Sequence, residues 1–241
     1  MILAIDAGNT RIKWGVRDGG AWRALGDVPT AEPGTLFESM WASLPVKRAI
    51  ASNVAGPGAQ ASIAAACARG AVSITFIKSE RAQLGVENGY RDHRQLGTDR
   101  WAALIAAHHA GPPGHKLVVN AGTALTIDAL TAEGRFLGGL IVPGPALMRG
   151  SLDRGTAGLR LTEGTLQDFP ASTPDAITSG AIQAAVGAVE RLGRVMAAHG
   201  SPPGRIILSG GAAAELAQSL PDATLNETLV LDGLLLIARN S

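Results

Sequence analysis

Asp6 stands directly after a short apolar run, residues 3–5, and directly before a turn that contains Gly8, Asn9 and Thr10. A turn of this composition exposes several backbone N–H groups, and glycine lets a phosphate oxygen approach them closely. The Asn and Thr side chains add donors, and Lys13 adds a positive charge if strand alternation turns it inward. Asp6 is placed to hold Mg²⁺ through water, because this ion takes only one or two carboxylates. The segment therefore predicts a phosphate and magnesium site, although an ordinary hairpin turn also explains it.

The same pattern returns in the second half of the chain. The segment "LAIDAGNTRI" aligns with "LVVNAGTALT", so that Asn120 stands 114 residues after Asp6 and Thr123 supplies a hydroxyl in the second turn. A repeat of this size indicates two related lobes that face each other, because solenoid repeats are only about 20 to 50 residues long. No G-x-x-x-x-G-K-[ST] segment and no convincing G-x-G-x-x-G after a strand occurs. The two hairpins are therefore the candidate nucleotide site.

The composition is that of a folded, soluble protein with one core or two compact lobes. The chain has 241 residues, of which 46% are apolar, and a formal charge of +1 with acids and bases interspersed. No charge block indicates a nucleic-acid partner, and no apolar run approaches the roughly 18 residues that span a bilayer. The start "MILAID" reaches an acid too early for a secretory signal, so we expect a cytoplasmic protein without a membrane partner.

Cysteine and histidine do not form a predicted metal site. Cys67 is the only cysteine, which excludes an internal disulfide, and we expect it to be a core or helix residue. His108 and His109 are adjacent on a helical stretch, where neighbouring residues point to different faces. Joint chelation of zinc by this pair is therefore not expected.

The hydrophobic pattern predicts mixed α/β structure in both halves. The expected strands lie at the two runs of the second hairpin and at residues 2–6, 12–17, about 46–52, 71–78, 136–144 and 205–211. The expected helices lie near residues 59–70, 98–110, 174–199 and 228–238. Thr98 is expected to cap the second of these helices. The segment "GPPGH" after it marks a boundary between lobes 1–113 and 114–241.

Two glycine-bearing hairpins that grip the phosphates of one nucleotide are typical of the acetate and sugar kinase, heat-shock ATPase and actin superfamily. Within it, the chain resembles the type III pantothenate kinases, whose motifs occur here in order over nearly the full length. The matching segments are "DAGNTRIKWG" at 6–15, "YRDHRQLGTDRWAAL" at 90–104, "NAGTALTID" at 120–128, "GGLIVPG" at 138–144, "ASTPDAITSGA" at 171–181 and "LSGGAA" at 208–213. The resemblance implies an α/β fold of two related ribonuclease H-like lobes, with the active site in the cleft between them.

The resemblance also implies a phosphotransferase that transfers phosphate from ATP to the terminal hydroxyl of pantothenate, the first step of coenzyme A biosynthesis. In this reading Asp99 is the general base, kept ionised by the start of its helix and by Arg100. Arg100 offers a planar guanidinium to the carboxylate of pantothenate, and Tyr90 presents its ring and hydroxyl to the same group. Gly97 and Thr98 line the approach.

The implied nucleotide contacts come from both hairpins. They are Asp6, Ala7, Gly8, Asn9, Thr10, Arg11, Ile12, Lys13 and Thr123. Asp6 is the implied Mg²⁺ residue, and Asn120 stands where relatives commonly have an aspartate associated with potassium or ammonium. A neutral amide attracts such an ion less, which leaves dependence on it in doubt. Gly210 and Gly211 would approach adenosine, although an ordinary strand-to-helix turn explains them nearly as well.

Thr173 matches the family threonine that reaches the substrate from the neighbouring subunit, and it is also placed to cap a helix before Pro174. The resemblance therefore implies a homodimer with an active site shared between subunits and with its dimer helices in the C-terminal lobe. His93 stands where relatives often have proline, which alters the loop without removing a catalytic group.

Two other functions remain open on the sequence. A sugar kinase would share the fold and the first hairpin, and would differ in the segment from Tyr90 to Arg100. One branch of the family is described as an accessory factor for transcription, and its members share the motifs, so the sequence separates a regulator from an enzyme poorly. A heat-shock-type ATPase is less expected, because the chain lacks the length for a peptide-binding domain.

Overall fold

The computed structural model describes residues 1–32, 44–155 and 163–240. The chain forms two compact units, of which the first comprises Met1–Ala110 and Thr228–Ser241 and the second comprises Gly111–Glu227. Among the described residues, no helix is both long and apolar enough to cross a membrane.

The first unit is built on a five-stranded sheet with the strand order β3-β2-β1-β4-β5. Its strands are β1 (Ile2–Ala7), β2 (Arg11–Asp18), β3 (Ala21–Pro29), β4 (Arg48–Asn53) and β5 (Ser73–Phe76). β1 pairs antiparallel with β2 and parallel with β4, as the predicted hairpin and the following strand require. A second, small hairpin of β6 (Ala82–Gln83) and β7 (Val86–Asn88) is followed by the 3-10 helix η1 (His93–Gln95).

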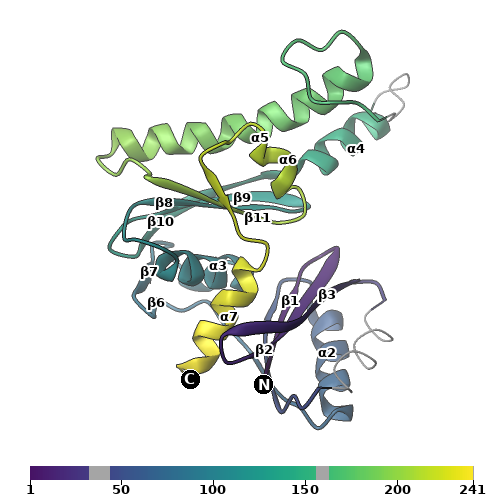
Figure 1. Ribbon diagram of the computed structural model, residues 1–241, viewed down its shortest axis with the longest axis vertical. Helices are drawn as coiled ribbons and strands as arrows, with labels where there is room; N and C mark the ends of the chain where they lie inside the picture. The colour runs from purple at the N-terminus through teal and green to yellow at the C-terminus, as the bar shows by residue number, and fades with distance from the viewer. Residues whose placement is uncertain (33–43, 156–162, 241) are drawn as a thin grey trace. The chain divides into compact units, whose positions relative to one another are not determined.

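Helices cover the two faces of this sheet differently. α2 (Pro57–Arg69) packs against β4 and β5 on one side, and α3 (Thr98–His109) lies on the other side (Figure 1). Successive strand residues point to opposite faces, so Leu3 and Ile5 join Ile63 and Cys67 of α2 in an apolar core. The predicted core position of Cys67 is confirmed. The opposite face is the one that carries Asp6.

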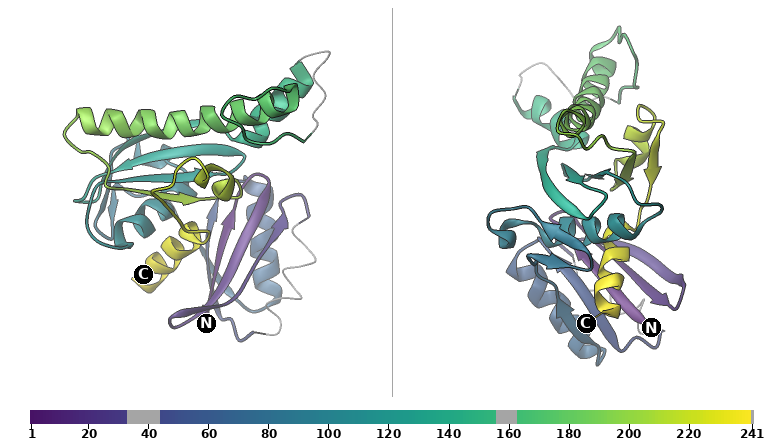
Figure 2. Two further views of the ribbon diagram at one scale, coloured as in Figure 1. Left: turned by 45° about the horizontal axis from the view of Figure 1, so that its top comes forward. Right: turned by 90° about the vertical axis from the view of Figure 1, so that its left-hand side faces the viewer.

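The last helix, α7 (Leu229–Arg239), belongs to the first unit rather than to the C-terminal lobe in which we expected it. Most of its apolar side chains, Leu234 among them, are buried, and the helix packs against α3, β1 and β4 (Figure 2). At Gly233 the helix backbones approach so closely that an added Cβ would lie 1.9 Å from the carbonyl oxygen of Ala102. The expected lobe boundary after residue 113 lies three residues beyond the observed one, after Ala110. The sequence did not indicate that α7 packs in the first unit.

The second unit contains five strands in the order β12-β11-β8-β9-β10. They are β8 (Lys116–Ala121), β9 (Ala124–Leu130), β10 (Arg135–Pro143), β11 (Arg205–Ser209) and β12 (Ala223–Leu225). Its helices are α4 (Pro145–Gly155), α5 (Thr173–Ala198) and α6 (Ala213–Ala217). The buried side of α5 packs on β8 and β9 through Ile182, Ala185 and Val189.

The two units repeat one strand arrangement. β1, β2 and β3 form an antiparallel meander, and β1 continues in parallel through β4 and β5. β8, β9 and β10 form the same meander, and β8 continues in parallel through β11 and β12. α3 follows the last strand of the first half, and α7 follows the last strand of the second. The repeat predicted from the two Ala-Gly turns is therefore confirmed at the level of whole sheets.

Gly233→Ala is expected to destabilise the protein by about 1 to 3 kcal/mol, because the new methyl group forces α7 away from the backbone of α3. Gly187→Ala is the control, since Gly187 lies within α5 with nothing within 4 Å of an added Cβ. The control is expected to be neutral or stabilising by up to about 1 kcal/mol. Urea unfolding measures both changes, and equal effects of the two substitutions would contradict the close packing of α7 on α3.

Candidate active site

The turn of the first hairpin is fixed by backbone contacts at both ends. The Gly8 amide donates to the carbonyl of Arg11 at 3.1 Å, and an added Cβ on Gly8 would lie 3.2 Å from the same oxygen. Thr30, after β3, donates its hydroxyl to the Gly8 carbonyl at 2.7 Å and its amide to the Thr10 carbonyl at 3.0 Å. Asn9 and Thr10 are exposed at the tip. The turn is thus a firmly held loop with polar side chains presented outward.

The other predicted residues of this hairpin divide between core and surface. Ala7 and Ile12 are fully buried, so only their backbone groups are available to a ligand. Arg11 is exposed and forms an ion pair with Asp27 of β3. Lys13 lies directly opposite Asp6 in the antiparallel pair of β1 and β2. Because directly paired strand residues share a face, Lys13 is on the same side of the sheet as Asp6, the inward orientation that a phosphate contact needs.

A row of polar residues crosses the sheet at Asp6. Lys13 of β2 and Ser52 of β4 are its register partners on either side. One carboxylate oxygen, Asp6 Oδ1, is buried and has no hydrogen-bond partner among the described residues. Burial raises the pKa of Asp6 to about 7, the negative charge of Asp99 adds to the rise, and Lys13 opposes it. Asp6 is therefore a half-buried residue with one buried carboxylate oxygen, whose charge Lys13 offsets only in part.

Asp6 suits a divalent cation that takes its other ligands from water or from a bound molecule. Within the described ranges, no three His, Cys, Asp or Glu side chains gather as a metal cluster. A site with one protein carboxylate suits Mg²⁺, which completes its octahedral shell with water and phosphate oxygens. The orphaned Asp6 oxygen and the neighbouring Lys13 amine are the groups that such an ion and a phosphate would meet.

α3 begins beside this row. Ser52, fully buried, lies with its hydroxyl 2.8 Å from the hydroxyl of Thr98, the first residue of α3. The expectation that Thr98 caps the helix is wrong, because Gly97 occupies the N-cap position without a side-chain hydrogen bond. Thr98 instead joins the helix start to β4. Ser52 was missed in the sequence, where its only signal was its position near the end of a predicted strand.

Asp99 folds back against the start of its own helix. Its Oδ1 accepts a hydrogen bond from the Arg100 amide at 2.8 Å and would lie 2.5 Å from a Cβ on Gly97, so glycine leaves the room that this side chain uses. Burial raises the pKa of Asp99, against the lowering effect of that hydrogen bond and of the Arg100 charge. We expected the helix start and Arg100 to favour the ionised form, and their lowering effect on the pKa of Asp99 is smaller than the raising effect of burial.

Arg100 and Tyr90 are brought together across ten residues. Arg100 is only 5% exposed, and its Nη1 donates to the Tyr90 hydroxyl at 3.0 Å. The guanidinium carbon also lies 5.6 Å from the centre of the Tyr90 ring. A buried guanidinium next to a phenol forms a recognition point for an anion such as a carboxylate.

The second unit gathers its own candidate residues at the ends of β8 and β11. Gly144 donates its amide to the Thr123 carbonyl at 2.8 Å, and an added Cβ on Gly144 would lie 2.1 Å from the Gly122 carbonyl oxygen. Gly210 has φ +99°, and a Cβ there would lie 2.5 Å from the carbonyl oxygen of Ala121. The second hairpin is therefore packed directly against the Gly210 turn, which requires glycine for its conformation.

Asn120 lies in the row that corresponds to the Asp6 row. Its register partners are Ser209 of β11 and Thr126 of β9, which take the places of Ser52 and Lys13. The first row contains an acid and a base, and the second contains only neutral side chains. Ser209 was not identified in the sequence beyond its place in "LSGG".

Thr173 is exposed at the first position of α5 and does not cap it. The predicted cap role belongs to Ser172, whose hydroxyl accepts from the Asp175 amide and donates to the Asp175 carboxylate at 2.6 Å. Hydrogen bonds from Ser172 and Thr165 lower the pKa of Asp175. The hydroxyl of Thr173 is thus not used to cap the start of its own helix.

The sequence is similar to known proteins over nearly its whole length. A family model described as type III pantothenate kinase matches residues 2–194. A type III pantothenate kinase from Aromatoleum aromaticum is 46% identical over 244 residues, which cover 99% of this chain and 98% of that protein. One from Nitrosospira multiformis is 42% identical, with 100% of this chain and 92% of that protein covered.

Solved structures with low identity share the fold. A Campylobacter jejuni protein provisionally assigned as a Baf family transcriptional activator matches with a TM-score of 0.62 at 18% identity, covering 99% of this chain and 98% of that chain. MreB5 of Spiroplasma citri, solved bound to ADP, matches with a TM-score of 0.52 at 10% identity, covering 99% and 96%. These likenesses concern the fold alone, and they confirm the predicted actin-like architecture.

Asp6→Asn is expected to stabilise the ligand-free protein, by an amount that grows between about pH 4, the ordinary carboxyl value, and about pH 7, the value for Asp6. Folding raises the pKa of this carboxyl group, so the wild-type protein loses stability as pH rises through this window. Asparagine does not titrate, and the variant therefore avoids this loss. The gain above the window is expected to be about 2 to 4 kcal/mol. Urea unfolding in EDTA at about pH 5 and about pH 8 measures it.

The exposed acid Asp222 provides the control, because Asp222→Asn should shift stability equally at both pH values. A gain for Asp6→Asn that is also the same at both pH values would contradict the burial of an ionisable, unpartnered carboxylate at this position.

Proposed function

Because this chain belongs to the type III pantothenate kinase family, we propose specific roles for the residues described above in its reaction. The chain is an ATP-dependent kinase that phosphorylates pantothenate to 4′-phosphopantothenate, which opens coenzyme A biosynthesis. The observation that carries the role assignment is the position of the start of α3 beside Asp6: Ser52, the register partner of Asp6, lies with its hydroxyl 2.8 Å from that of Thr98, the residue before Asp99. Two carboxyl groups in one place, one suited to a cation and one to a proton, are what transfer of a phosphoryl group to an alcohol requires.

Asp99 is the proposed general base. Its carboxylate takes the proton of the pantothenate hydroxyl as the oxygen attacks the terminal phosphate of ATP. A pKa raised by burial brings the group closer to the working pH, which favours proton transfer by a carboxylate. The acid limb of the activity profile should then lie above the ordinary carboxyl range. The Ser52 to Thr98 hydrogen bond supports the position of this helix start.

Asp6 and the first hairpin are the proposed binding groups for magnesium and phosphate. Asp6 would hold Mg²⁺ through water, and the bound ion would neutralise phosphate charge. Lys13 adds a positive charge on the same face. The remaining nucleotide contacts proposed are backbone and side-chain groups of residues 7–12, together with Thr123 and, for adenosine, Gly210 and Gly211.

Arg100 and Tyr90 are the proposed partners of the substrate carboxylate. The buried guanidinium and the phenol hydroxyl form adjacent donors once the carboxylate replaces part of their mutual contact. Gly97 and Thr98, just before Asp99, are proposed to line the path of the pantothenate chain. The family relationship, rather than the first hairpin, argues against a sugar kinase.

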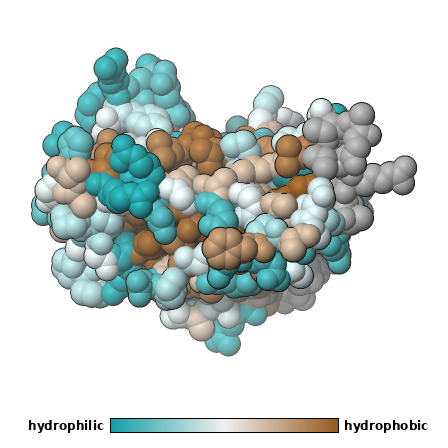
Figure 3. Space-filling view, turned by 90° about the horizontal axis from the view of Figure 1, so that it is seen from above, coloured by the Kyte–Doolittle hydropathy of each residue, from teal (hydrophilic) through white to brown (hydrophobic). Residues whose placement is uncertain are grey.

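A homodimer with an active site shared between subunits is proposed, with Thr173 contacting the substrate of the partner. Support comes from the exposed position of Thr173 and from apolar side chains at the surface of the second unit, such as Ile141 and Phe169. Seen from the side that carries α5, the surface shows hydrophobic patches between hydrophilic ones (Figure 3). We expect the reaction to take place in the cytoplasm. A regulatory role remains an alternative that shares the same fold.

Asp99→Asn is expected to lower turnover about 10²- to 10⁴-fold, because the amide cannot accept the hydroxyl proton. Pantothenate-dependent ADP release with Mg²⁺ present measures turnover, and circular dichroism and thermal unfolding check the fold. The matched control is Asp222→Asn, at an exposed acid in the second unit. Full activity of a folded Asp99→Asn protein would show that the base is another group.

Asn120→Asp is expected to increase the stimulation of turnover by potassium at least about threefold, because a carboxylate attracts the ion more strongly than an amide. The wild-type protein is expected to respond weakly. Potassium titrations at constant ionic strength, with Asn240→Asp near the C-terminus as the control, measure the response. Strong potassium dependence of the wild type, unchanged by the substitution, would mean that Asn120 does not set cation affinity.

A further inference from the structure

Asn88 is a buried polar residue whose whole amide group is engaged in holding one loop. It is 4% exposed and ends β7. Its Nδ2 donates to the carbonyls of Glu80 at 3.3 Å and His93 at 3.2 Å, and its Oδ1 accepts from the Tyr90 amide at 3.1 Å. One side chain thus ties together three points of the segment between β5 and α3.

The base of the same loop is closed by a second buried contact. Ser79, 4% exposed, donates its hydroxyl to the carbonyl of Leu96 at 2.7 Å. The backbone N–H of Asn88 also donates to the carbonyl of Arg81 at 2.9 Å. The loop from 79 to 96 is therefore held from inside, where water does not replace a lost hydrogen bond, and Asn88 is its central tie.

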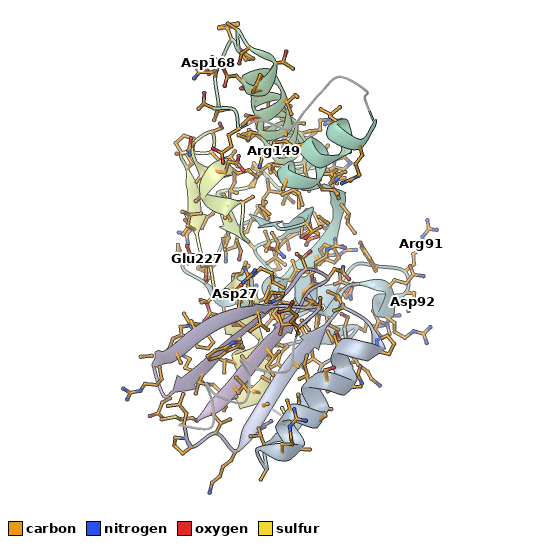
Figure 4. The ribbon with its side chains drawn as sticks, turned by 90° about the vertical axis from the view of Figure 1, so that its right-hand side faces the viewer. Asp27, Arg91, Asp92, Arg149, Asp168 and Glu227 are labelled. Carbon is orange, nitrogen blue, oxygen red and sulfur yellow. The ribbon has the colours of Figure 1, made fainter. Side chains whose placement is uncertain are left out.

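The hydrogen bonds of Asn88 fix the position of Tyr90. The bond from the Tyr90 amide to Asn88 Oδ1 fixes the backbone two residues after β7, in the manner of an Asx turn. Arg91, the next residue, is exposed and extends away from the ribbon (Figure 4). Tyr90 is half-buried and reaches the Arg100 guanidinium. A shift of the backbone at Tyr90 would move the phenol off the guanidinium.

We propose that Asn88 is a positioning residue that sets the selectivity of the enzyme for the carboxylate end of its substrate. It does so without contacting the substrate, by holding Tyr90 against Arg100. The inference rests on the proposed role of Tyr90 and Arg100 as partners of the carboxylate. It assigns the loop from 79 to 96 to substrate recognition, and leaves phosphate binding and proton transfer to other residues.

Asn88→Leu tests the proposal, because leucine has the same branching and number of side-chain heavy atoms and makes none of the three side-chain hydrogen bonds. Kinetics are measured with pantothenate and with pantothenol, in which a primary alcohol replaces the carboxylate. We expect KM for pantothenate to rise about 10-fold, while kcat and KM for ATP change less than about twofold. The kcat/KM for pantothenol should also change less than about threefold, so that the preference for the acid falls.

The control is Thr228→Val, which removes the 2.9 Å hydrogen bond to Asp232 at the start of α7 in the same unit. It should lower stability without changing the preference for the acid. Asn88→Ser, a milder substitution that can still accept from the Tyr90 amide, should change the preference in the same direction by less. It provides the test if the leucine variant does not fold.

Equal losses with pantothenate and pantothenol would overturn the proposal, because Asn88 would then support only the fold. Tyr90→Phe and Arg100→Lys distinguish the remaining cases. If these two lower the preference for the acid and the Asn88 variants do not, the role of Asn88 is wrong and the carboxylate site stands. If none of the four changes the preference, both assignments are overturned.

Discussion

The carboxylate of Asp6 lies at the end of β1 where the protein supplies little to offset its charge. One oxygen is buried without a hydrogen bond among the described residues, and a second acid, Asp99, lies near enough to raise its pKa further. Burying such a group costs stability unless a partner neutralises it. Mg²⁺ and phosphate in the first hairpin would supply that partner only when substrate is present. Neutralising the Asp6 charge would therefore contribute to the binding of a cation at this position.

The two units have the same strand arrangement, but only the first carries an acid at this position. Both units place a polar row across the ends of equivalent strands, with Asp6 between Lys13 and Ser52 in the first and Asn120 between Thr126 and Ser209 in the second. The first row is charged and coupled to the start of α3, and the second is neutral and packed against glycine turns. One scaffold therefore carries a charged polar row in one unit and a neutral polar row in the other.

Much of this was predictable from the sequence, because glycine turns and apolar strands are local signals. The two hairpins, the repeat and most helices were predicted at nearly their observed bounds. The properties that depend on packing were not predicted. The place of Ser52 beside Asp6 depends on the pairing of β4 with β1, and its contact with Thr98 joins residues 46 positions apart in the sequence. The packing of α7 in the first unit and the raised pKa of Asp99 likewise depend on contacts between segments that are distant in the sequence.

Burial and the nearby charge of Asp99 raise the pKa of Asp6 to about 7 in the protein without ligands. A carbon-13 NMR titration of the aspartate carboxyl groups in ligand-free protein tests it directly. The account predicts one resonance, missing from Asp6→Asn, that titrates near pH 7 and moves to the ordinary range near pH 4 when Mg²⁺ and nucleotide are added. Titration of every aspartate below about pH 5 in the ligand-free protein would contradict the account.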